Sequence, residues 1–316
     1  MPIWSDSSRQ RAAGIALAVA VDAVLADPRR GHPVALFGRA AAALEKRLYG
    51  DARPYGVIHV ALLTGAATAL GVAAERVRNP VVRTGLTAAA TWAVLGGTTL
   101  AREGAAMADA LEEGDLPRAR RRLPHLCGRD PRDLEAPELA RATVESLAEN
   151  TSDAVVAPLF WGAVAGVPGL LAYRVINTLD AMVGHRSPRY ARFGWAAARL
   201  DDVANYVPAR VTGLITVAVG PDRRQALAVL RRDGHRHPSP NAGRCESAFA
   251  GALGLTLGGT NVYAGRTEER PTMGDGRKPE VRDIRRAARL TRAVSLAAAA
   301  LAVIASLRPG RKDREG

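Results

Sequence analysis

The sequence has 316 residues and a net charge of +13; 47% of the residues are apolar and only 4% are aromatic. Its two cysteines, Cys127 and Cys245, lie in no C-x-x-C or Cys/His ligand spacing, which argues against a structural zinc site or a disulfide framework. The arginines are not interleaved with aromatic residues, which argues against nucleic acid and leaves anionic lipid and phosphorylated small molecules as partners.

Apolar segments recur along the chain. The apolar content is mostly Ala, Val and Leu, and small side chains suit helices that pack closely in a membrane. Asp22 and the polar DPRRGHP motif after it indicate a retained first helix rather than a secretory signal. Three stretches carry no formal charge and approach the roughly 20 residues that cross a hydrocarbon core: Tyr55–Ala74, Thr84–Ala101 and Ala154–Tyr173. Three more are shorter or interrupted by charge: Ala12–Ala26, Val203–Gly220 and Ala293–Leu307.

These segments predict an all-α fold: a polytopic integral membrane helical bundle with long polar loop and helix segments, forming a single domain over residues 1–316. A soluble all-α protein with buried Ala-rich helices is the alternative. Uncharged runs of this length are unusual on soluble helices, which need one polar face, so we favour the membrane. Arg-rich loops lie on both sides of several candidate spans, so the sequence does not predict their orientation.

Two polar regions separate the apolar segments. Arg102–Ser152 predicts two helices, one ending at Gly114 and one beginning near Pro137, a favourable first-turn residue. Gly220–Arg292 is rich in Gly, Pro and Arg, and strand-like alternation is scarce throughout. The glycines of LGGTNVYAGR predict either a turn that lets the backbone approach an anion or a Gly-rich turn without a ligand.

The motif ESLAENTSDAVVAPLFWG contains the first candidate site. Glu145, Glu149 and Asp153 recur every four residues and share one helix face, with Asn150 beside them. Because this face runs into an uncharged segment, it predicts carboxylates that hold Mg²⁺ or act as a base. The equally weighted alternative is a solvated helix face on which Arg141 pairs with Glu145.

Two further motifs combine acidic, amide and basic side chains. In YRVINTLDAMVGHRSPRY, Arg174, Asn177 and Asp180 can share a helix face that suits a phosphate and its metal, with His185 and Arg186 after the helix end. The alternative is a helix C-terminus at which the last two cap carbonyls. In RLDDVANYVPAR, the side chains of Asp201, Asp202 and Asn205 are spaced to converge on one Mg²⁺, or they are ordinary helix N-terminal charge.

The motif GHRHPSPNAGRCESA predicts a binding loop stiffened by Pro238 and Pro240. Its polar side chains are those of His235, His237, Ser239, Asn241 and Glu246, and no third zinc ligand follows at a usual spacing. Phosphate-loop, dinucleotide-binding and nucleophile-elbow motifs do not occur in the sequence.

Together these motifs resemble one family. GHPVALFGR, ESLAENTSDAVVAPLFWG, NTLDAMVGHRSPRYARFGWAAARLDDVANYVPAR and HPSPNAGRCESAFAGALG follow in the order and spacing of the adenosylcobinamide-phosphate synthase (cobinamide synthase) family of cobalamin biosynthesis proteins. The resemblance covers about Gly14 to Gly265 and weakens after Arg266. It implies a multi-pass protein of the bacterial inner (cell) membrane.

The resemblance also implies a reaction. ATP and Mg²⁺ would drive amide ligation of (R)-1-aminopropan-2-ol O-phosphate to the free propionate carboxyl of adenosylcobyric acid, with no tightly bound prosthetic group. For this reaction the metal candidates are Asp201, Asp202 and Asn205, followed by Glu149 and Asp153. The candidates for proton acceptor are Glu145, Glu149 and His185, and Arg186, Arg189 and Arg210 are the candidates for substrate phosphates. The other candidate binding residues are Asn150, Arg174, Asn177, Asp180, His237, Ser239 and Asn241.

Two other functions stay open at this point. A corrinoid transporter component would use polar residues inside spans, such as Asp22, to line a path. A membrane scaffold would gather other late cobalamin-pathway enzymes and bind without turnover. The predicted partners are the two substrates and the lipid bilayer.

Overall fold

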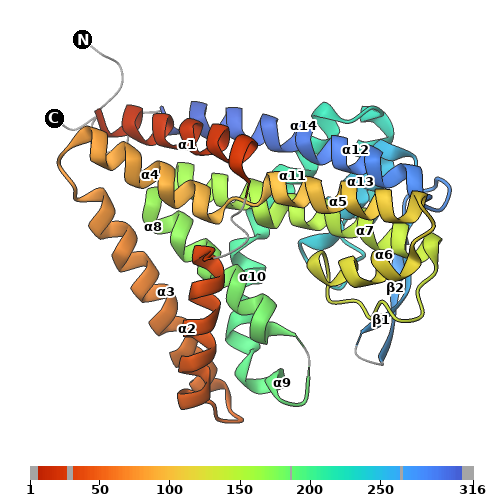
Figure 1. Cartoon of the computed structure of the whole chain (residues 1–316), viewed down its shortest axis with the longest axis horizontal. Coiled ribbons are helices and arrows are strands. Elements are labelled where there is room, and N and C mark those ends of the chain that lie inside the picture. Colours follow the sequence, from red (N-terminus) through yellow and green to blue (C-terminus); the bar gives the residue numbers. More distant parts are fainter. Residues whose placement is uncertain (1–5, 27–30, 186, 264–265, 308–316) are drawn as a thin grey trace. The chain divides into compact units, whose positions relative to one another are not determined.

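The computed structural model describes residues 6–26, 31–185, 187–263 and 266–307, and it divides into two compact units. The first unit comprises the described residues of 1–96, 157–205 and 299–316, and the second those of 97–156 and 206–298. Helices make up most of both units, as the all-α prediction requires (Figure 1).

In the first unit, α1 lies along α4, and α3 lies along α8 (Figure 1). A buried cluster around Phe193, Leu179 and Val183 packs the short helices at one end against α3. Gly56 permits this packing, because a Cβ there would collide with the carbonyl of Phe193. The elements are α1 (Asp6–Leu25), α2 (Pro33–Leu48), α3 (Arg53–Glu75), α4 (Pro80–Val94), α8 (Ala157–Leu179), the π-helical turn η3 (Asp180–Gly184), α9 (Tyr190–Phe193) and α10 (Trp195–Ala204).

Helix α8 is kinked in its middle. Gly166 takes φ +63° there, and Pro168 follows, which removes a backbone donor. The carboxylate of Glu75 accepts the N–H of Val167 at 3.1 Å, so the helix restarts with one of its free donors bonded. The predicted span 154–173 is therefore helical but not straight.

In the second unit, α13 is buried along almost its whole length and packs against α7, α11 and α12. Asp233, 1% exposed, joins α12 to the end of β2, since it accepts hydrogen bonds from Arg232 at 2.6 Å and from the N–H of Gly274 at 2.9 Å. The helices are α5 (Gly97–Glu112), α6 (Leu116–Arg122), the 3₁₀ turn η1 (Leu123–His125), α7 (Ala136–Thr151), the π-helical turn η2 (Ser152–Val156), α11 (Tyr206–Val219), α12 (Arg223–Asp233), α13 (Ala242–Leu253) and α14 (Val281–Ser306), whose last turns fall in the first unit.

A two-stranded antiparallel hairpin is the element that the sequence analysis missed. Strand β1 (Leu257–Tyr263) pairs with β2 (Arg266–Met273), and a bulge lies at Gly258 and Gly259, whose φ values are +89° and +94°. The glycines expected to form a turn thus supply the bulge of a strand, because glycine adopts positive φ without steric cost.

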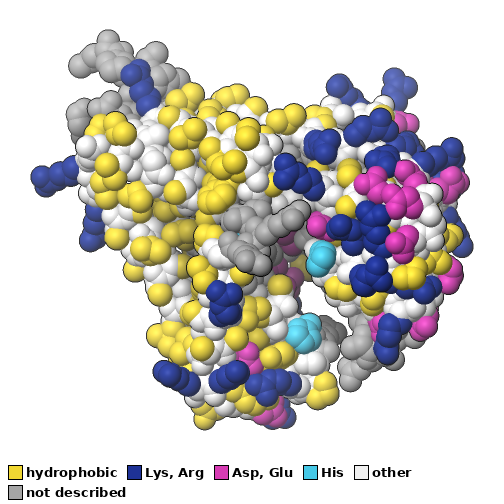
Figure 2. All heavy atoms as spheres, viewed as in Figure 1, with side chains coloured by type: hydrophobic (Ala, Val, Ile, Leu, Met, Phe, Trp, Pro, Cys, Tyr) yellow, Lys and Arg dark blue, Asp and Glu magenta, His cyan; other side chains and the backbone are white. Residues whose placement is uncertain are grey.

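Within the described residues, three helical runs are long and apolar enough to cross a membrane: Arg53–Glu75, Ala136–Gly184 and Val281–Ser306. The first two contain the predicted spans 55–74 and 154–173, and the third covers residues 293–306 of the predicted span 293–307. Hydrophobic side chains also gather on the surface over α1, α3 and α4, including those of Leu17, Leu62 and Val81 (Figure 2). The composition of these helices suggests a membrane protein.

Two other predicted spans do not form single helices. In 84–101, α4 ends at Val94, Leu95 is extended, and a new helix begins at Gly97 after a pair of glycines that favour a break. In 203–220, the chain breaks at Asn205, whose side chain bonds back to Asp201. The helix that follows, α11, has 14 residues and is shorter than a typical span.

Candidate functional site

The polar residues predicted from the sequence form two clusters, one in each unit. The first-unit cluster centres on Asp201 in α10. The amide nitrogen of Asn205 donates to Oδ2 of Asp201 at 3.0 Å, and that of Asn177 in α8 donates to Oδ1 at 3.4 Å. The hydroxyl of Tyr173 donates to Oδ1 of Asn205 at 2.8 Å and fixes its amide orientation. The carboxylate of Asp201 is therefore held in place by amide donors.

A second carboxylate lies beside this one. Desolvation, and after it the charge of Asp180, raises the pKa of Asp201 to about 7. Asp180 begins η3, and its carboxylate lies over Gly184, where a Cβ would collide with it. The absence of a side chain at Gly184 thus leaves room for the Asp180 carboxylate.

The donor set of this cluster fits Mg²⁺. Mg²⁺ is commonly bound by one or two carboxylates together with water and substrate phosphates, and Asp180 and Asp201 supply two neighbouring carboxylates that are otherwise repelled by each other. Asn205 has its side-chain oxygen on Tyr173, and Asp202 pairs with Arg199 at 3.5 Å. The charges of both Asp180 and Asp202 act on Asp201, and that of Asp180 has the larger effect. Across the described residues, no preformed group of three His, Cys, Asp or Glu ligands is present.

An apolar groove of about 900 Å³ runs between α3 and α10 in the same unit. Its walls include Thr64 and Gly65 of α3 and Leu200 of α10, and Arg76 and Arg199 supply positive charge at its edge. Because Leu200 and Asp201 are consecutive in α10, the helix that presents the carboxylate also forms the groove.

The structure also places three other predicted residues of the first unit, Arg189, His185 and Arg174. Arg189 pairs with Glu45 at 2.9 Å and stacks over the ring of Tyr49. His185 is exposed and packs edge-on against Tyr190. Arg174 lies in α8, one turn before Asn177, and Arg186 falls outside the described residues.

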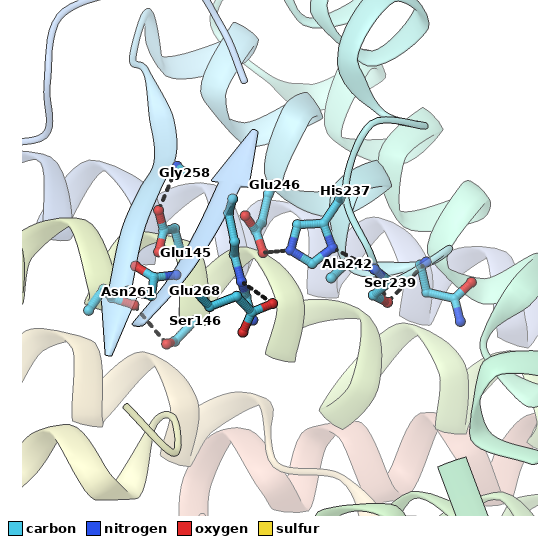
Figure 3. Close-up of polar contacts among 12 residues, drawn as sticks. Glu145, Ser146, His237, Ser239, Ala242, Glu246, Gly258, Asn261 and Glu268 are labelled. Atoms are coloured by element: carbon cyan, nitrogen blue, oxygen red, sulfur yellow. Dashed lines mark hydrogen bonds and ion pairs between the residues drawn. The ribbon is translucent and has the colours of Figure 1, made fainter. Parts of the chain in front are cut away.

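The second-unit cluster is built around Glu145, which is 4% exposed in α7. Arg129 donates to its Oε2 at 2.5 Å, and Arg141 donates to its Oε1 at 3.4 Å. The N–H of Gly258 also donates to Oε1, at 2.8 Å (Figure 3). Arg141 also donates to Asn261 at 3.0 Å and thus holds the hairpin against α7. With its oxygens occupied by these donors, Glu145 serves as a buried anchor more readily than as a proton acceptor.

Four other predicted residues lie on nearby elements of this unit. Glu149 is half-buried one turn after Glu145, and Asp153 lies in η2. Asn150 is committed to backbone, because its amide donates to the carbonyls of Leu126 and Ser146. Arg210 in α11 donates to the carbonyl of Tyr206 and stacks on that ring at 3.4 Å.

The loop before α13 places His237 inside the cluster. Nδ1 of His237 accepts the N–H of Ser239 at 3.0 Å, and Oγ of Ser239 accepts the N–H groups of Asn241 and Ala242 at the start of α13. A Cβ at Gly243 would lie 2.5 Å from the Cβ of His237, so this glycine lets the ring pack against the helix. Burial lowers the pKa of His237 to about 4, so the ring is neutral near pH 7.

Glu246, one turn into α13, completes the cluster. It is 1% exposed, and its Oε1 lies 3.9 Å from Nε2 of His237 (Figure 3). Desolvation, followed by the charges of Glu145 and Glu149, raises the pKa of Glu246 well above its ordinary value, against the opposing charges of Arg270 and Arg129.

The basic half of this cluster is not visible in the sequence motifs. Arg129 and Arg270 lie in polar segments where many arginines occur, so composition did not distinguish them. Arg141 was considered as a partner of Glu145, and the structure confirms that pair, but its bond to Asn261 spans 120 residues. Tyr173 was missed because its role is to orient Asn205, a contact that no local pattern signals.

The fold and the two clusters define a helical protein with apolar spans and buried carboxylates set among amide and guanidinium donors. The CobD/Cbib protein family matches residues 15–291 of this chain. A cobalamin biosynthesis protein CobD of Mycobacterium tuberculosis (strain H37Rv) is 55% identical over 306 residues, which cover 96% of this chain and 98% of that protein. CobD proteins of Geobacter metallireducens and Rhodobacter capsulatus are 44% and 43% identical, covering 83% and 86% of this chain and 86% and 89% of theirs.

No solved structure matches. This chain belongs to the CobD/Cbib family, and its role lies in cobalamin biosynthesis. The family resemblance in the sequence motifs is thereby confirmed.

Proposed function

We propose that this protein is the ligase that joins (R)-1-aminopropan-2-ol O-phosphate to the free propionate of adenosylcobyric acid, with hydrolysis of ATP. The observation that carries the proposal is a pair of neighbouring carboxylates in a chain of this family: Asp201, which accepts hydrogen bonds from two amides, and Asp180, whose charge acts on it. Such a pair is suited to hold the Mg²⁺ that accompanies a nucleotide triphosphate.

The chemistry requires activation of a poor electrophile. The corrinoid carboxylate attacks the γ-phosphorus of ATP, ADP leaves, and an acyl phosphate forms. The amine then attacks the acyl carbon, loses a proton and expels inorganic phosphate. Mg²⁺ held by Asp180 and Asp201 would shield the charge between the phosphate oxygens and the attacking carboxylate. Tyr173 and Asn205 keep Asp201 in position for that role.

The groove along α3 and α10 supports the assignment of the corrinoid. Its apolar walls suit one face of a macrocycle, and Arg76 and Arg199 complement peripheral oxygens of the ligand. Since α10 carries both Leu200 of the groove and Asp201 of the carboxylate pair, we assign the groove to the corrinoid rather than to the amino alcohol.

Product formation by purified protein tests the proposal. The full chain in detergent is incubated with adenosylcobyric acid, aminopropanol phosphate, ATP and Mg²⁺, and the products are followed by mass spectrometry. We expect a product whose mass is that of both substrates less one water, and only when ATP is present. Tight corrinoid binding without this product would contradict the ligase and favour a transporter or scaffold.

A further inference from the structure

A buried carboxylate without a donor is the most unusual polar feature of the second unit. Neither oxygen of Glu246 accepts a hydrogen bond from any described residue, although the side chain is 1% exposed. Burial of a charged group without hydrogen bonds is costly, and the free energy is recovered only by a proton or by a bound cation. Glu246 is thus incomplete without a further group.

Two N–H donors near Glu246 also lack hydrogen-bond partners among the described residues. Nε2 of His237 has no hydrogen-bond partner among the described residues, and because Nδ1 accepts the N–H of Ser239, the proton of the neutral ring lies on Nε2. The amide nitrogen of Asn261 in β1, 2% exposed, likewise has no partner. Figure 3 shows His237, Glu246 and Asn261 in the same polar cluster, from three different segments.

This combination selects a class of ligand. Glu149 is a second carboxylate whose charge acts on Glu246, but the described residues contain no group of three His, Cys, Asp or Glu side chains that could hold a metal ion. Glu145 is already bonded to Arg129, Arg141 and the N–H of Gly258. The unbonded carboxylate of Glu246 beside unsatisfied N–H donors instead matches a small molecule that carries both an ammonium group and acceptor oxygens. The positive charges of Arg129 and Arg270, which act on Glu246, add attraction for an anionic part of such a molecule.

We propose that Glu246 binds the amino group of the amino alcohol phosphate, while His237 and Asn261 donate to oxygens of the same molecule. This rests on the proposed ligase function and assigns its amine substrate to the second-unit cluster. Glu246 lies on the most buried helix of the unit, which fixes the carboxylate, and Gly243 and Ser239 fix His237 beside it.

The same contact would serve the reaction. The ammonium group of the ligand can transfer one proton to the Glu246 carboxylate. The transfer gives a free amine and a carboxylic acid, and the total number of protons does not change. As the nitrogen becomes a nucleophile, one N–H bond breaks and one O–H bond forms on Glu246. The phosphate on the amino alcohol and the charge elsewhere in the cluster are unchanged by this transfer.

Binding of two matched ligands tests the assignment. Calorimetric titration of the full chain in detergent, without ATP or corrinoid, compares aminopropanol phosphate with propan-2-yl phosphate, which has the same phosphate but no amine. We expect the wild type to bind the amine-bearing ligand at least about tenfold more tightly. Glu246→Gln is expected to bind both ligands alike. Glu269→Gln, an exposed carboxylate on β2, is the control and is expected to keep the preference.

Other outcomes would overturn the assignment. Equal affinities in the wild type, or a preference that survives in Glu246→Gln, place the amine elsewhere. If Glu246→Gln does not fold, as judged by its melting temperature, Glu246→Asp keeps the charge but withdraws it by one methylene, and it is expected to reduce the preference; an unchanged preference there also contradicts the site.

The ligase and the amine site can fail separately. If the wild type prefers the amine-bearing ligand through Glu246 but forms no amide, the ligase function is contradicted and the amine-binding site is retained. If the wild type and Glu246→Gln both form the amide with the same KM for the amine, the amine-binding site is contradicted and the ligase function is retained.

Discussion

Asp201 in the first unit and Glu246 in the second are both carboxylates whose pKa is raised by desolvation, but their surroundings differ. Asp201 accepts two amide N–H bonds and faces a second carboxylate, whereas Glu246 has no donor among the described residues and stands among charges of both signs. The difference teaches that a raised pKa alone does not define a role. Asp201, held by amides beside a second carboxylate, suits a cation that both carboxylates bind. Glu246, which has no hydrogen bond, suits a ligand that brings its own donor.

The largest expected effect comes from breaking the ion pair that supports the second-unit cluster. Arg129→Met leaves Glu145 buried without its shortest partner, and the free energy of unfolding is expected to fall by about 3–5 kcal/mol. The double variant Arg129→Met with Glu145→Met is expected to recover much of this loss. Denaturant unfolding in detergent, followed by circular dichroism, measures both, and an Arg129→Met protein as stable as the wild type would show that the pair does not support the cluster.

The next effect sharpens the role of the first-unit carboxylates. Asp201→Asn removes one of the two neighbouring charges and is expected to lower the rate of product formation about 100-fold, or about 2.7 kcal/mol at the transition state. Asp51→Asn, an exposed carboxylate in the same unit, is expected to retain the wild-type rate. Full activity of Asp201→Asn at limiting Mg²⁺ would remove this residue from the metal site.

A third variant contrasts Glu246 with a buried carboxylate that is fully bonded. The hydrogen bond from Arg232, together with those from Gly274 and Arg236, lowers the pKa of Asp233 to about 2. A lowered pKa contributes stability above the pKa of the unfolded chain, near 4, and this contribution disappears as the pH falls toward 2. Asp233→Asn is therefore expected to cost about 2 kcal/mol at pH 7 and to become closer to the wild type at pH 2–3.

Unfolding curves across this pH range measure the effect. A stability difference between Asp233→Asn and the wild type that stays constant from pH 7 to pH 2 would show that the ionised carboxylate is not the source of the stabilisation.

The smallest effect concerns the groove beside Asp201. A Cβ at Gly65 meets no atom within 4 Å, so Gly65→Leu fills the groove without disturbing the fold. We expect KM for the corrinoid to rise about tenfold, or 1.4 kcal/mol, with little change in KM for the amino alcohol. Gly85 in α4 has equally open space but lies outside the groove, so Gly85→Leu is the matched control. Equal corrinoid KM values for the two variants would show that the corrinoid does not bind in the groove.

Much of the fold could be predicted from local patterns. The apolar run 55–74 is one helix, and α7 begins at Ala136 with Pro137 in its first turn, because Glu135 and Glu138 form a capping box there. The hairpin and the breaks after Val94 and Ala204 could not, since glycine bulges and helix ends depend on which neighbours pack against them. The site was predicted as lists of polar residues, without the pairings among them.

The sequence by itself determined most of the helices, some of the apolar spans, the family and the contacts that close within one helical turn. Arg141 with Glu145 and Asp201 with Asn205 are such contacts, because residues four apart face each other on a helix. Only the tertiary structure decided that the charge of Asp180 acts on Asp201, and that Glu246 lies near Glu145 and His237 without a hydrogen bond. Desolvation and charge proximity depend on packing between distant segments, and no spacing along the chain encodes them.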